Sequence, residues 1–356
     1  MEKDSLLHDL SQKGVSRREF MKFCTAMAAA LALPSSFAPQ IAEAIEKKKK
    51  PTLVWVEYQD CAGNTESLLR ATKPTVADLV LDIISVDYHE TIMAAAGKQA
   101  EKSLFDVINN QKGNYIAVVE GSIPMKDDGV YCTIGGRSAT DLVQQVCGNA
   151  LATIAVGTCA CYGGLPAAHP NPTGAVGVKD AVSGIKVVNL PGCPVNVENI
   201  TATVVHYLTF GALPSTDRLG RPYFAYGERI HDHCERRAHF DAGQFVRQWG
   251  DEGHRQGWCL YQMGCKGPET FKNCSVVKYN EGTSWPVQAG HGCIGCASPN
   301  FWDTMTPFYR RLPHAPGVSI ETTADKIGLG LAAAAAAGVA VHAVASSARK
   351  SGHKEE

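Results

Sequence analysis

The chain has 356 residues, and 45% of them are hydrophobic, which is enough to form a core in each of about two domains. Its 34 basic residues are matched by 35 acidic ones, and this balance disfavours nucleic-acid binding because the phosphate backbone requires an excess of positive charge. The 13 cysteines are too many for incidental core packing and too scattered for a small disulfide-stabilised fold, so they indicate metal binding.

Residues 1–44 have the features of an export signal. Ser16-Arg17-Arg18-Glu19-Phe20-Met21-Lys22 precedes an apolar stretch from Phe23 to Leu33, and Ala42-Glu43-Ala44 fits the small-residue rule for signal cleavage. This order predicts a twin-arginine signal. Because that route carries proteins that have already folded, often with a cofactor inserted, we expect a metal-loaded periplasmic protein.

Residues 51–214 alternate short apolar strands with helical patterns. The predicted strands are Thr52–Glu57, Leu79–Val86, Tyr115–Glu120, Leu151–Val156 and Ile185–Leu190. The predicted helices between them include Thr65–Ala71, Lys102–Asn110 and Ala139–Ala150. This alternation is typical of an α/β fold, and we expect a flavodoxin-like domain with a mostly parallel sheet covered by helices on both faces.

Three cysteines of this domain each follow a predicted strand within a few residues, namely Cys61, Cys159 and Cys193. Because the carboxyl ends of parallel strands share one edge of the sheet, three thiolates distant in sequence can meet there. Neighbouring glycines let the backbone approach an inorganic cluster, and free amides can hydrogen-bond its sulfurs. The pattern therefore predicts a thiolate-ligated site at this edge.

Residues 215–318 lose the periodicity and are dense in glycine, histidine, cysteine and aromatic residues. The metal-ligating residue types here are His231, Cys234, Cys259, Cys265, Cys274, Cys293 and Cys296. Their number exceeds what one four-ligand ion can use, although zinc, a redox dithiol at Cys293-Ile294-Gly295-Cys296 and disulfides all stay open. A loop-rich segment of this kind is expected to depend on bound metal for its order.

Residues 327–345 contain no Asp, Glu, Lys or Arg, and Arg349 and Lys350 follow them. This length just spans a bilayer core. A soluble alanine-rich helix is the alternative, but the basic tail at the end of the chain favours a transmembrane anchor with the body outside the cytoplasm.

Taken together, these features resemble a known family, the small subunit of membrane-bound, periplasmic nickel-iron hydrogenases of the uptake type. The resemblance covers the whole chain, including the export signal, the cysteines after the strands and the C-terminal anchor. Its most specific strings are Arg229-Ile230-His231-Asp232-His233-Cys234, Met263-Gly264-Cys265-Lys266-Gly267-Pro268 and Gly290-His291-Gly292-Cys293-Ile294-Gly295-Cys296.

The resemblance implies three iron-sulfur clusters. A proximal 4Fe-4S cluster would be bound by Cys61, Cys159 and Cys193. A medial 3Fe-4S cluster would be bound by Cys274, Cys293 and Cys296, with Pro286 in the place of a fourth cysteine. A distal 4Fe-4S cluster would be bound by His231, Cys234, Cys259 and Cys265.

The proximal site departs from the family pattern. The fourth ligand of that family is a cysteine three residues after the first, and this sequence has Asn64 there. An Asn64 oxygen, Asp60 or Cys161 can take its place, or the cluster can differ, and the sequence leaves these alternatives open. The oxygen-tolerant relatives carry further cysteines at the positions of Gly63 and Gly164, so their six-cysteine cluster is not expected.

The remaining cysteines have simpler expectations. Cys24 leaves with the export signal. Cys147 lies in a predicted helix and is expected to be a small buried hydrophobic residue, and Cys132 is expected to be structural as well.

The resemblance also implies the function and the partners. Dihydrogen would be split in a separate large subunit that carries the nickel-iron centre, so this chain has no catalytic residue of its own. It would pass electrons one at a time through its clusters to a membrane acceptor, a b-type cytochrome and then quinone. We expect a heterodimer on the periplasmic side of the cytoplasmic membrane that works in the direction of hydrogen uptake.

Two other classes of protein fit the residues without the resemblance. A binding module stabilised by zinc or disulfides would be colourless. A freestanding periplasmic iron-sulfur electron carrier would be a stable soluble monomer once the anchor is removed.

Overall fold

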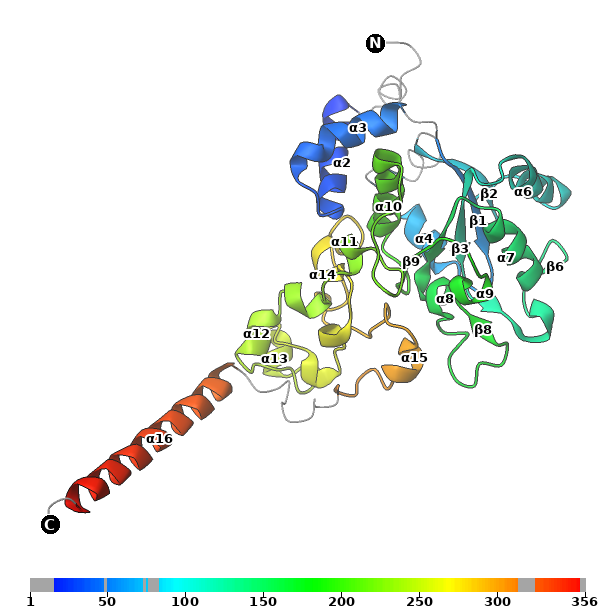
Figure 1. Cartoon of the computed structure of the whole chain (residues 1–356). Helices are drawn as coiled ribbons and strands as arrows, with labels where there is room; N and C mark the ends of the chain where they lie inside the picture. Colours follow the sequence, from blue (N-terminus) through cyan, green and yellow to red (C-terminus); the bar gives the residue numbers. More distant parts are fainter. Residues whose placement is uncertain (1–15, 48–49, 73–74, 76–82, 313–323, 353–356) are drawn as a thin grey trace.

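The computed structural model describes residues 16–47, 50–72, 75, 83–312 and 324–352. Its parts follow one another along the chain in Figure 1. Two N-terminal helices lie beside a sheet domain, a loop-rich region comes next, and one long helix projects away from the body.

The sheet domain contains a five-stranded sheet in the order β2-β1-β3-β7-β9, and every pair is parallel. The strands are β1 (Thr52–Glu57), β2 (Ser85–His89), β3 (Tyr115–Glu120), β7 (Ala152–Val156) and β9 (Val187–Leu190). Four of the five predicted strands are confirmed with small differences at their ends, and β9 begins later than expected. The second differs: the sequence predicts it over Leu79–Val86, but β2 runs over Ser85–His89, and residues 79–82 lie outside the described residues. Because the strand order reverses between β1 and β3, the topology is flavodoxin-like, and it leaves a crevice at their carboxyl ends.

Helices cover both faces of the sheet, as the alternating side chains of each strand require. They are α4 (Gly63–Leu69), α6 (Lys98–Asn110), α7 (Ala139–Gly148), α8 (Gly157–Tyr162), α9 (Val178–Ala181) and α10 (Val197–Phe210). Leu53 and Trp55 of β1 belong to the apolar core that contains α10. Val54 and Val56 point to the opposite face and belong to the core that contains α6 and α7. The strands are therefore buried on both sides, which explains their continuous apolar runs.

The loops at the carboxyl end of the sheet are packed tightly. The short pairs around them are β4 (Ile123–Pro124) with β8 (Ala175–Val176) and β5 (Thr133–Ile134) with β6 (Arg137–Ser138), and η3 (Lys126–Gly129) lies between them. Gly121 has a φ of +85°, and a Cβ there would lie 2.8 Å from the backbone of Gln59. Glycine is thus required where the loop after β3 meets the loop after β1.

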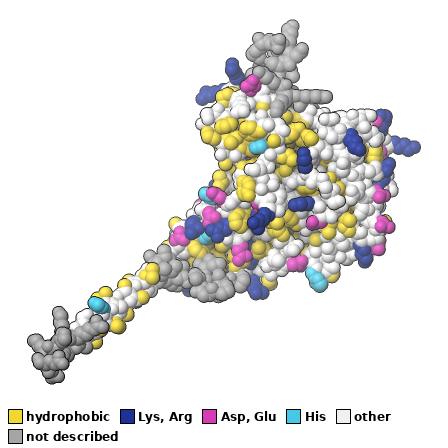
Figure 2. All heavy atoms as spheres, viewed as in Figure 1, with side chains coloured by type: hydrophobic (Ala, Val, Ile, Leu, Met, Phe, Trp, Pro, Cys, Tyr) yellow, Lys and Arg dark blue, Asp and Glu magenta, His cyan; other side chains and the backbone are white. Residues whose placement is uncertain are grey.

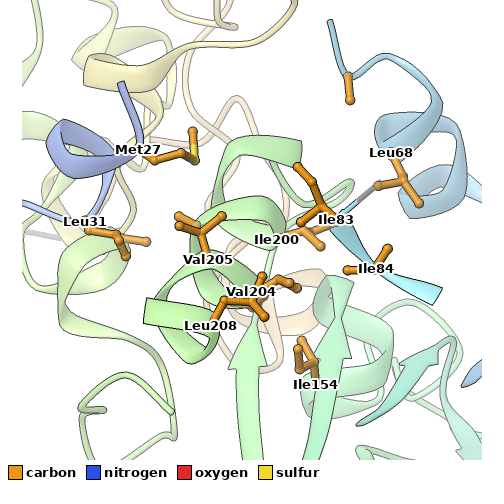
Figure 3. Close-up of a cluster of buried hydrophobic side chains, with 14 of the residues drawn as sticks. Met27, Leu31, Leu68, Ile83, Ile84, Ile154, Ile200, Val204, Val205 and Leu208 are labelled. Atoms are coloured by element: carbon orange, nitrogen blue, oxygen red, sulfur yellow. The ribbon is translucent and has the colours of Figure 1, made fainter. Parts of the chain in front are cut away.

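The predicted export signal forms a helical pair on the sheet domain. Its elements are α2 (Arg17–Ala30), η1 (Ser35–Phe37) and α3 (Ala38–Lys47). Met27 of α2 and Leu31, which directly follows that helix, lie in one apolar core with Val205 of α10, as Figure 3 shows. Arg17 and Arg18 are exposed, so the apolar part of the segment is buried while the arginine pair faces solvent.

The region from 215 to 312 has little regular structure. Its elements are α11 (Tyr223–Tyr226), η4 (Ile230–His233), α12 (Arg237–Asp241), α13 (Glu252–Arg255), η5 (Tyr261–Met263), η6 (Gly267–Glu269), α14 (Cys274–Val277) and α15 (Phe301–Thr304). Two small apolar clusters hold it, one around Leu260 and Trp285 and one around Phe245 and Tyr261. The predicted loss of periodicity is confirmed in this part of the chain.

The last helix, α16 (Ala324–Gly352), stands apart from the body. Within the described residues it alone is long and apolar enough to cross a membrane, over Gly328–Ser346, and none of that span is buried. Figure 2 shows apolar side chains along its open surface. A core helix of a soluble protein would be covered, so this arrangement favours the predicted anchor.

Candidate metal centres

The three cysteines predicted for the proximal site lie together at the carboxyl edge of the sheet. Cys61 follows β1, Cys159 lies in α8 directly after β7, and Cys193 follows β9. Cys61 and Cys193 are exposed and Cys159 is partly buried. The parallel sheet therefore brings three thiols that are up to 132 residues apart in the chain to one accessible edge, as their numbering shows.

These thiols oppose one another's ionisation. Burial, followed by the nearby thiolates of Cys296, Cys159 and Cys61, raises the pKa of Cys193 to about 12. Burial likewise raises the pKa of Cys159, and the charges of Cys61 and Asp60 add to that rise. A bound metal removes this cost because it holds thiolates in their deprotonated form. Metal binding would therefore favour the ionised form of Cys159 and Cys193, which burial disfavours.

The side chain of Asn64 is held by two hydrogen bonds beside this edge. Its Oδ1 accepts from the backbone N–H of Val195 at 2.9 Å, and its Nδ2 donates to Oε1 of Glu120 at 3.0 Å. Glu120 is fully buried, and Thr65 and Trp55 also donate to its Oε2. The Asn64 amide therefore links the end of β3 to the loop after β9 through both of its polar atoms.

Asp60 and Cys161, the other candidates for the fourth proximal ligand, differ in their surroundings. Cys161 is 2% exposed and belongs to the core with α6 and α7, where its Sγ donates to the carbonyl of Ala155 at 3.4 Å. Asp60 precedes Cys61, and its Oδ2 accepts from the N–H of Ala62 at 2.5 Å. Burial raises the pKa of Asp60. Cys161 is thus buried in the core, whereas Asp60 is exposed next to Cys61 in the chain.

The three predicted medial cysteines line one large cavity with a proximal cysteine. This cavity has a volume of about 570 Å³, and Cys193 lines it from the sheet domain while Cys274, Cys293 and Cys296 line it from the loop-rich region. The hydroxyl of Thr158 donates to the carbonyl of Cys296, so the loop of Cys159 is fixed to the medial loop as well. The proximal and medial sets are consequently neighbours.

Backbone amides point at several of these sulfurs. The N–H of Cys293 donates to Sγ of Cys265 at 3.2 Å, and the N–H of Gly295 donates to Sγ of Cys293 at 3.4 Å. The N–H of Arg236 donates to Sγ of Cys234 at 3.4 Å. Such bonds stabilise thiolate sulfur and tune cluster potentials. The first of them also joins the predicted distal set to the medial set.

The four residues predicted for the distal cluster line a second, smaller cavity. They are His231, Cys234, Cys259 and Cys265. Burial, and after it the Arg237 charge, lowers the pKa of His231 to about 4, so the ring is neutral and keeps a nitrogen lone pair for a metal. Phe240 packs edge-on against this ring with centroids 4.6 Å apart. The distal site therefore combines three thiols with one oriented imidazole.

The described residues form neither a single-ion site nor a disulfide. In the described part of the chain, no three or more His, Cys, Asp or Glu side chains converge closely enough to hold one metal ion. None of the 13 cysteines, all of which lie in that part, forms a disulfide. Zinc requires its ligands around one point at about 2.0–2.3 Å. A cluster distributes its cysteines over several irons, so its thiolates stand farther apart.

Three polar residues at these sites were not anticipated from the sequence. They are Glu120, Lys272 and Tyr279, and Lys272 is 2% exposed. Two of these positions carried a signal: Glu120 ends an apolar strand at its carboxyl edge, and Lys272 lies two residues before Cys274. A charged residue beside a ligand or at a strand end is therefore a useful marker.

Two family models match the chain. The C-terminal model of NiFe/NiFeSe hydrogenase small subunits matches residues 226–309, and the model of the 20 kDa subunit of NADH ubiquinone oxidoreductase matches residues 61–207. The first match covers most of the loop-rich region, and the second covers most of the sheet domain.

Several characterised proteins are similar over most of their length. The quinone-reactive Ni/Fe-hydrogenase small chain of Wolinella succinogenes is 49% identical over 345 residues, which cover 95% of this chain and 97% of that protein. The uptake hydrogenase small subunit of Azotobacter vinelandii is 48% identical over 334 residues, covering 94% of this chain and 93% of the other. The hydrogenase-2 small chain of Escherichia coli is 49% identical over 294 residues, covering 82% and 78%.

Solved structures show the same fold. A chain of the NiFeSe hydrogenase from Desulfomicrobium baculatum superposes with a TM-score of 0.70 at 34% identity, and the match covers 74% of this chain and 100% of that one. A chain of the NiFeSe hydrogenase from Desulfovibrio vulgaris Hildenborough gives a TM-score of 0.69 at 35% identity, covering 74% and 99%.

Proposed function

The chain belongs to the small subunits of nickel-iron hydrogenases, and from this membership we propose that it holds a proximal, a medial and a distal iron-sulfur cluster. It is the electron-transfer subunit of an oxidoreductase whose catalysis takes place in the large subunit with which it pairs. Iron-sulfur clusters accept and release single electrons at potentials set by ligands, charge and hydrogen bonds.

The observation that carries this proposal is the continuity of the three cysteine sets. Cys193 shares a cavity with Cys274, and the amide of Cys293 is bonded to the sulfur of Cys265. Electron transfer requires neighbouring redox centres. The three cysteine sets are neighbours in the order proximal, medial, distal. The ligands in this proposal are Cys61, Cys159 and Cys193, then Cys274, Cys293 and Cys296, then His231, Cys234, Cys259 and Cys265.

We assign the fourth proximal position to Asp60. Both polar atoms of the Asn64 side chain are engaged with Val195 and Glu120, so this residue braces the loops and does not bind iron. Cys161 points into the core of the sheet domain. Asp60 directly precedes Cys61, and its charge is among those that act on the Cys159 thiol, so it can supply an anionic oxygen, which is a better ligand for iron than a neutral amide.

The proposed direction of electron transfer is based on the exposure of the proximal cysteines and on the position of the anchor in the chain. Cys61 and Cys193 are exposed at the edge of the sheet, and this edge is where we expect the large subunit to dock and exclude water. The distal set lies in the loop-rich region, which the anchor α16 follows along the chain. Electrons would therefore leave toward the membrane, where a b-type cytochrome and quinone are the proposed acceptors, with the body exported by the twin-arginine route to the periplasmic side.

Iron analysis and electron paramagnetic resonance on the purified complex of both subunits test this function. We expect about 11 irons per small subunit, in two four-iron clusters and one three-iron cluster. Cys274→Ser should remove the medial signal selectively and slow electron delivery to the acceptor by more than about tenfold. A colourless complex, or one in which zinc replaces iron, contradicts the proposal.

Cys132→Ser is the matched control. Cys132 is partly buried and lies outside all three cysteine sets, so its replacement should leave the iron content and all three signals unchanged. A loss of iron in this variant as large as in Cys274→Ser would mean that the cysteines act through folding alone.

A further inference from the structure

A buried ammonium group lies between the proximal and medial cysteine sets. Lys272 is 2% exposed and lines the same cavity as Cys193 and Cys274. Its Nζ donates to the hydroxyl of Tyr279 at 2.9 Å and to the carbonyl of Pro194 at 3.4 Å. One lysine thus touches the loop that follows the proximal ligand Cys193 and the segment that carries the medial ligand Cys274.

The surroundings fix this ammonium in place. The Tyr279 hydroxyl also donates to the carbonyl of Pro194 at 3.2 Å, and it lies 3.9 Å from Sγ of Cys274. A Cβ at position 192 would collide with Nζ of Lys272, so Gly192 is what allows the ammonium to reach this loop. The charge is therefore held in a defined position against the cavity wall.

The charge balance of Lys272 points to an anion in the cavity. Among the described side chains, no carboxylate lies within ion-pair distance of its Nζ. A buried cation that has only neutral acceptors is costly unless a negative charge faces it. The cysteines that line the cavity with Lys272 are Cys274, Cys293 and Cys296 from the loop-rich region and Cys193 from the sheet domain. A thiolate-ligated cluster supplies the missing counter-charge.

We propose that Lys272 is a positioning residue that raises the reduction potential of the medial site above the value its three thiolates alone would give. This inference rests on the proposed function. When one electron enters the site of Cys274, Cys293 and Cys296, no bond forms or breaks, and the site gains one negative charge. A fixed cation in a poorly solvated position stabilises that added charge. The same cation would assist the proximal site less, because it faces one ligand there and two at the medial site.

Redox titration of the complete two-subunit complex, followed by electron paramagnetic resonance, tests this role. In Lys272→Met we expect the equilibrium constant for one-electron reduction of the medial site to fall at least tenfold, which is about 59 mV. The proximal value should fall less and the distal value should not change, so the distal site is an internal control. Methionine has a similar length, and Tyr279 and Pro194 keep their mutual hydrogen bond, so no buried polar atom loses its last partner.

Lys278→Met is the matched control, because this partly buried lysine lines the same cavity and lies on the same segment. It should leave the medial constant within about twofold of the wild type. Lys272→Gln, which keeps donors for Tyr279 and Pro194 but not the charge, should reproduce the fall seen with methionine.

The outcomes separate this inference from the function it rests on. A medial signal whose constant stays within about twofold in both Lys272 variants overturns the inference, and so do equal shifts of all three sites. Failure of both variants to assemble the medial site also overturns it, because the lysine would then be structural. Absence of any medial signal in the wild-type complex contradicts the proposed function instead.

Discussion

The sheet domain and the loop-rich region after it obtain their order from different sources. In the sheet domain, five strands and their helices bury two large apolar cores, and Cys61, Cys159 and Cys193 lie after the strands and outside those cores. In the region from 215 to 312, the longest helix has five residues, and Cys265, Cys274 and Cys293 are themselves members of a small apolar cluster. The proposed proximal site is therefore attached to a domain that has its own core, whereas the cysteines of the proposed medial and distal sites form part of the core of their region.

We therefore expect the sheet domain to fold without bound metal and the loop-rich region to depend on bound metal for its folded structure. Burying a large aliphatic side chain contributes about 1.5–3 kcal/mol, and the sheet domain has many such residues. The loop-rich region has few, so in the proposed function the bonds between its cysteines and iron would replace contacts that a larger core would provide.

Removal of iron should therefore have the largest and most local effect. In the complex prepared without iron, we expect amide hydrogen exchange in residues 215–312 to approach the rate of an unfolded chain, while the central strands β1, β3 and β7 stay protected. Hydrogen exchange followed by mass spectrometry, with the iron-loaded complex as reference, measures both regions in one experiment.

The comparison fails if both regions lose protection together, because the sheet domain would then depend on iron as well. It also fails if neither region changes. Exchange in α7 is a useful reference inside the molecule, because this helix packs only in the sheet domain.

Substitutions of Asp60 and Asn64 should distinguish a ligand of the cluster from a residue that only holds neighbouring segments together by hydrogen bonds. Asp60→Ala should alter the proximal spectrum and release about one iron per chain, while the stability of the sheet domain changes little. Asn64→Ala should do the opposite, because the Val195 N–H loses its partner at a cost of about 1–3 kcal/mol while the spectrum stays the same. Iron analysis, resonance spectra and thermal unfolding of both variants decide between the two roles.

Cys161→Ser is the control for this pair, because its side chain lies in the core away from the edge. A changed proximal spectrum in Asn64→Ala together with an unchanged one in Asp60→Ala would reverse the assignment.

The smallest expected effect is a dependence of the stability of the sheet domain on pH. Burial is the main cause that raises the pKa of Glu90 to about 8, well above its ordinary value of 4.5. The folded protein therefore binds this proton more tightly than the unfolded chain, and the resulting stability is complete below about pH 4.5 and is lost as the pH rises through about 8. We expect the unfolding temperature of the sheet domain to fall from pH 6.5 to 9, by about 2–4 °C for each kcal/mol lost.

Glu90→Gln should flatten this dependence, because glutamine is neutral throughout the range. Working above pH 6.5 avoids His89, whose pKa burial lowers to about 4. An equally steep fall in the Glu90→Gln variant, measured by calorimetry, would assign the dependence to another group.

Much of the secondary structure of the sheet domain was predictable because the sequence patterns that indicate it involve only neighbouring residues. The apolar runs of β1 and β3 have the same bounds as predicted, since a strand buried on both faces leaves a continuous pattern in the sequence. Helix ends were less accurate: α4 begins at Gly63 and ends at Leu69, because Ala62 adopts a left-handed conformation before it, which residue type does not reveal.

The candidate sites were predictable only in part. Cysteines after strands can be located from the strands, so the edge at Cys61, Cys159 and Cys193 followed from the topology. Nothing local distinguishes Asp60 from Asn64 as a fourth ligand, because the difference depends on which of their atoms already have hydrogen-bond partners.

The sequence by itself determined the order of strands and helices, the positions of the metal-ligating residue types and the charge-free C-terminal span, because each of these is a property of neighbouring residues. Only the tertiary structure decided that Asn64 is bound to Val195, 131 residues away, and that Lys272 meets Pro194, 78 residues away. A hydrogen bond or a buried charge depends on what stands opposite it in space, and a linear pattern does not record that neighbour.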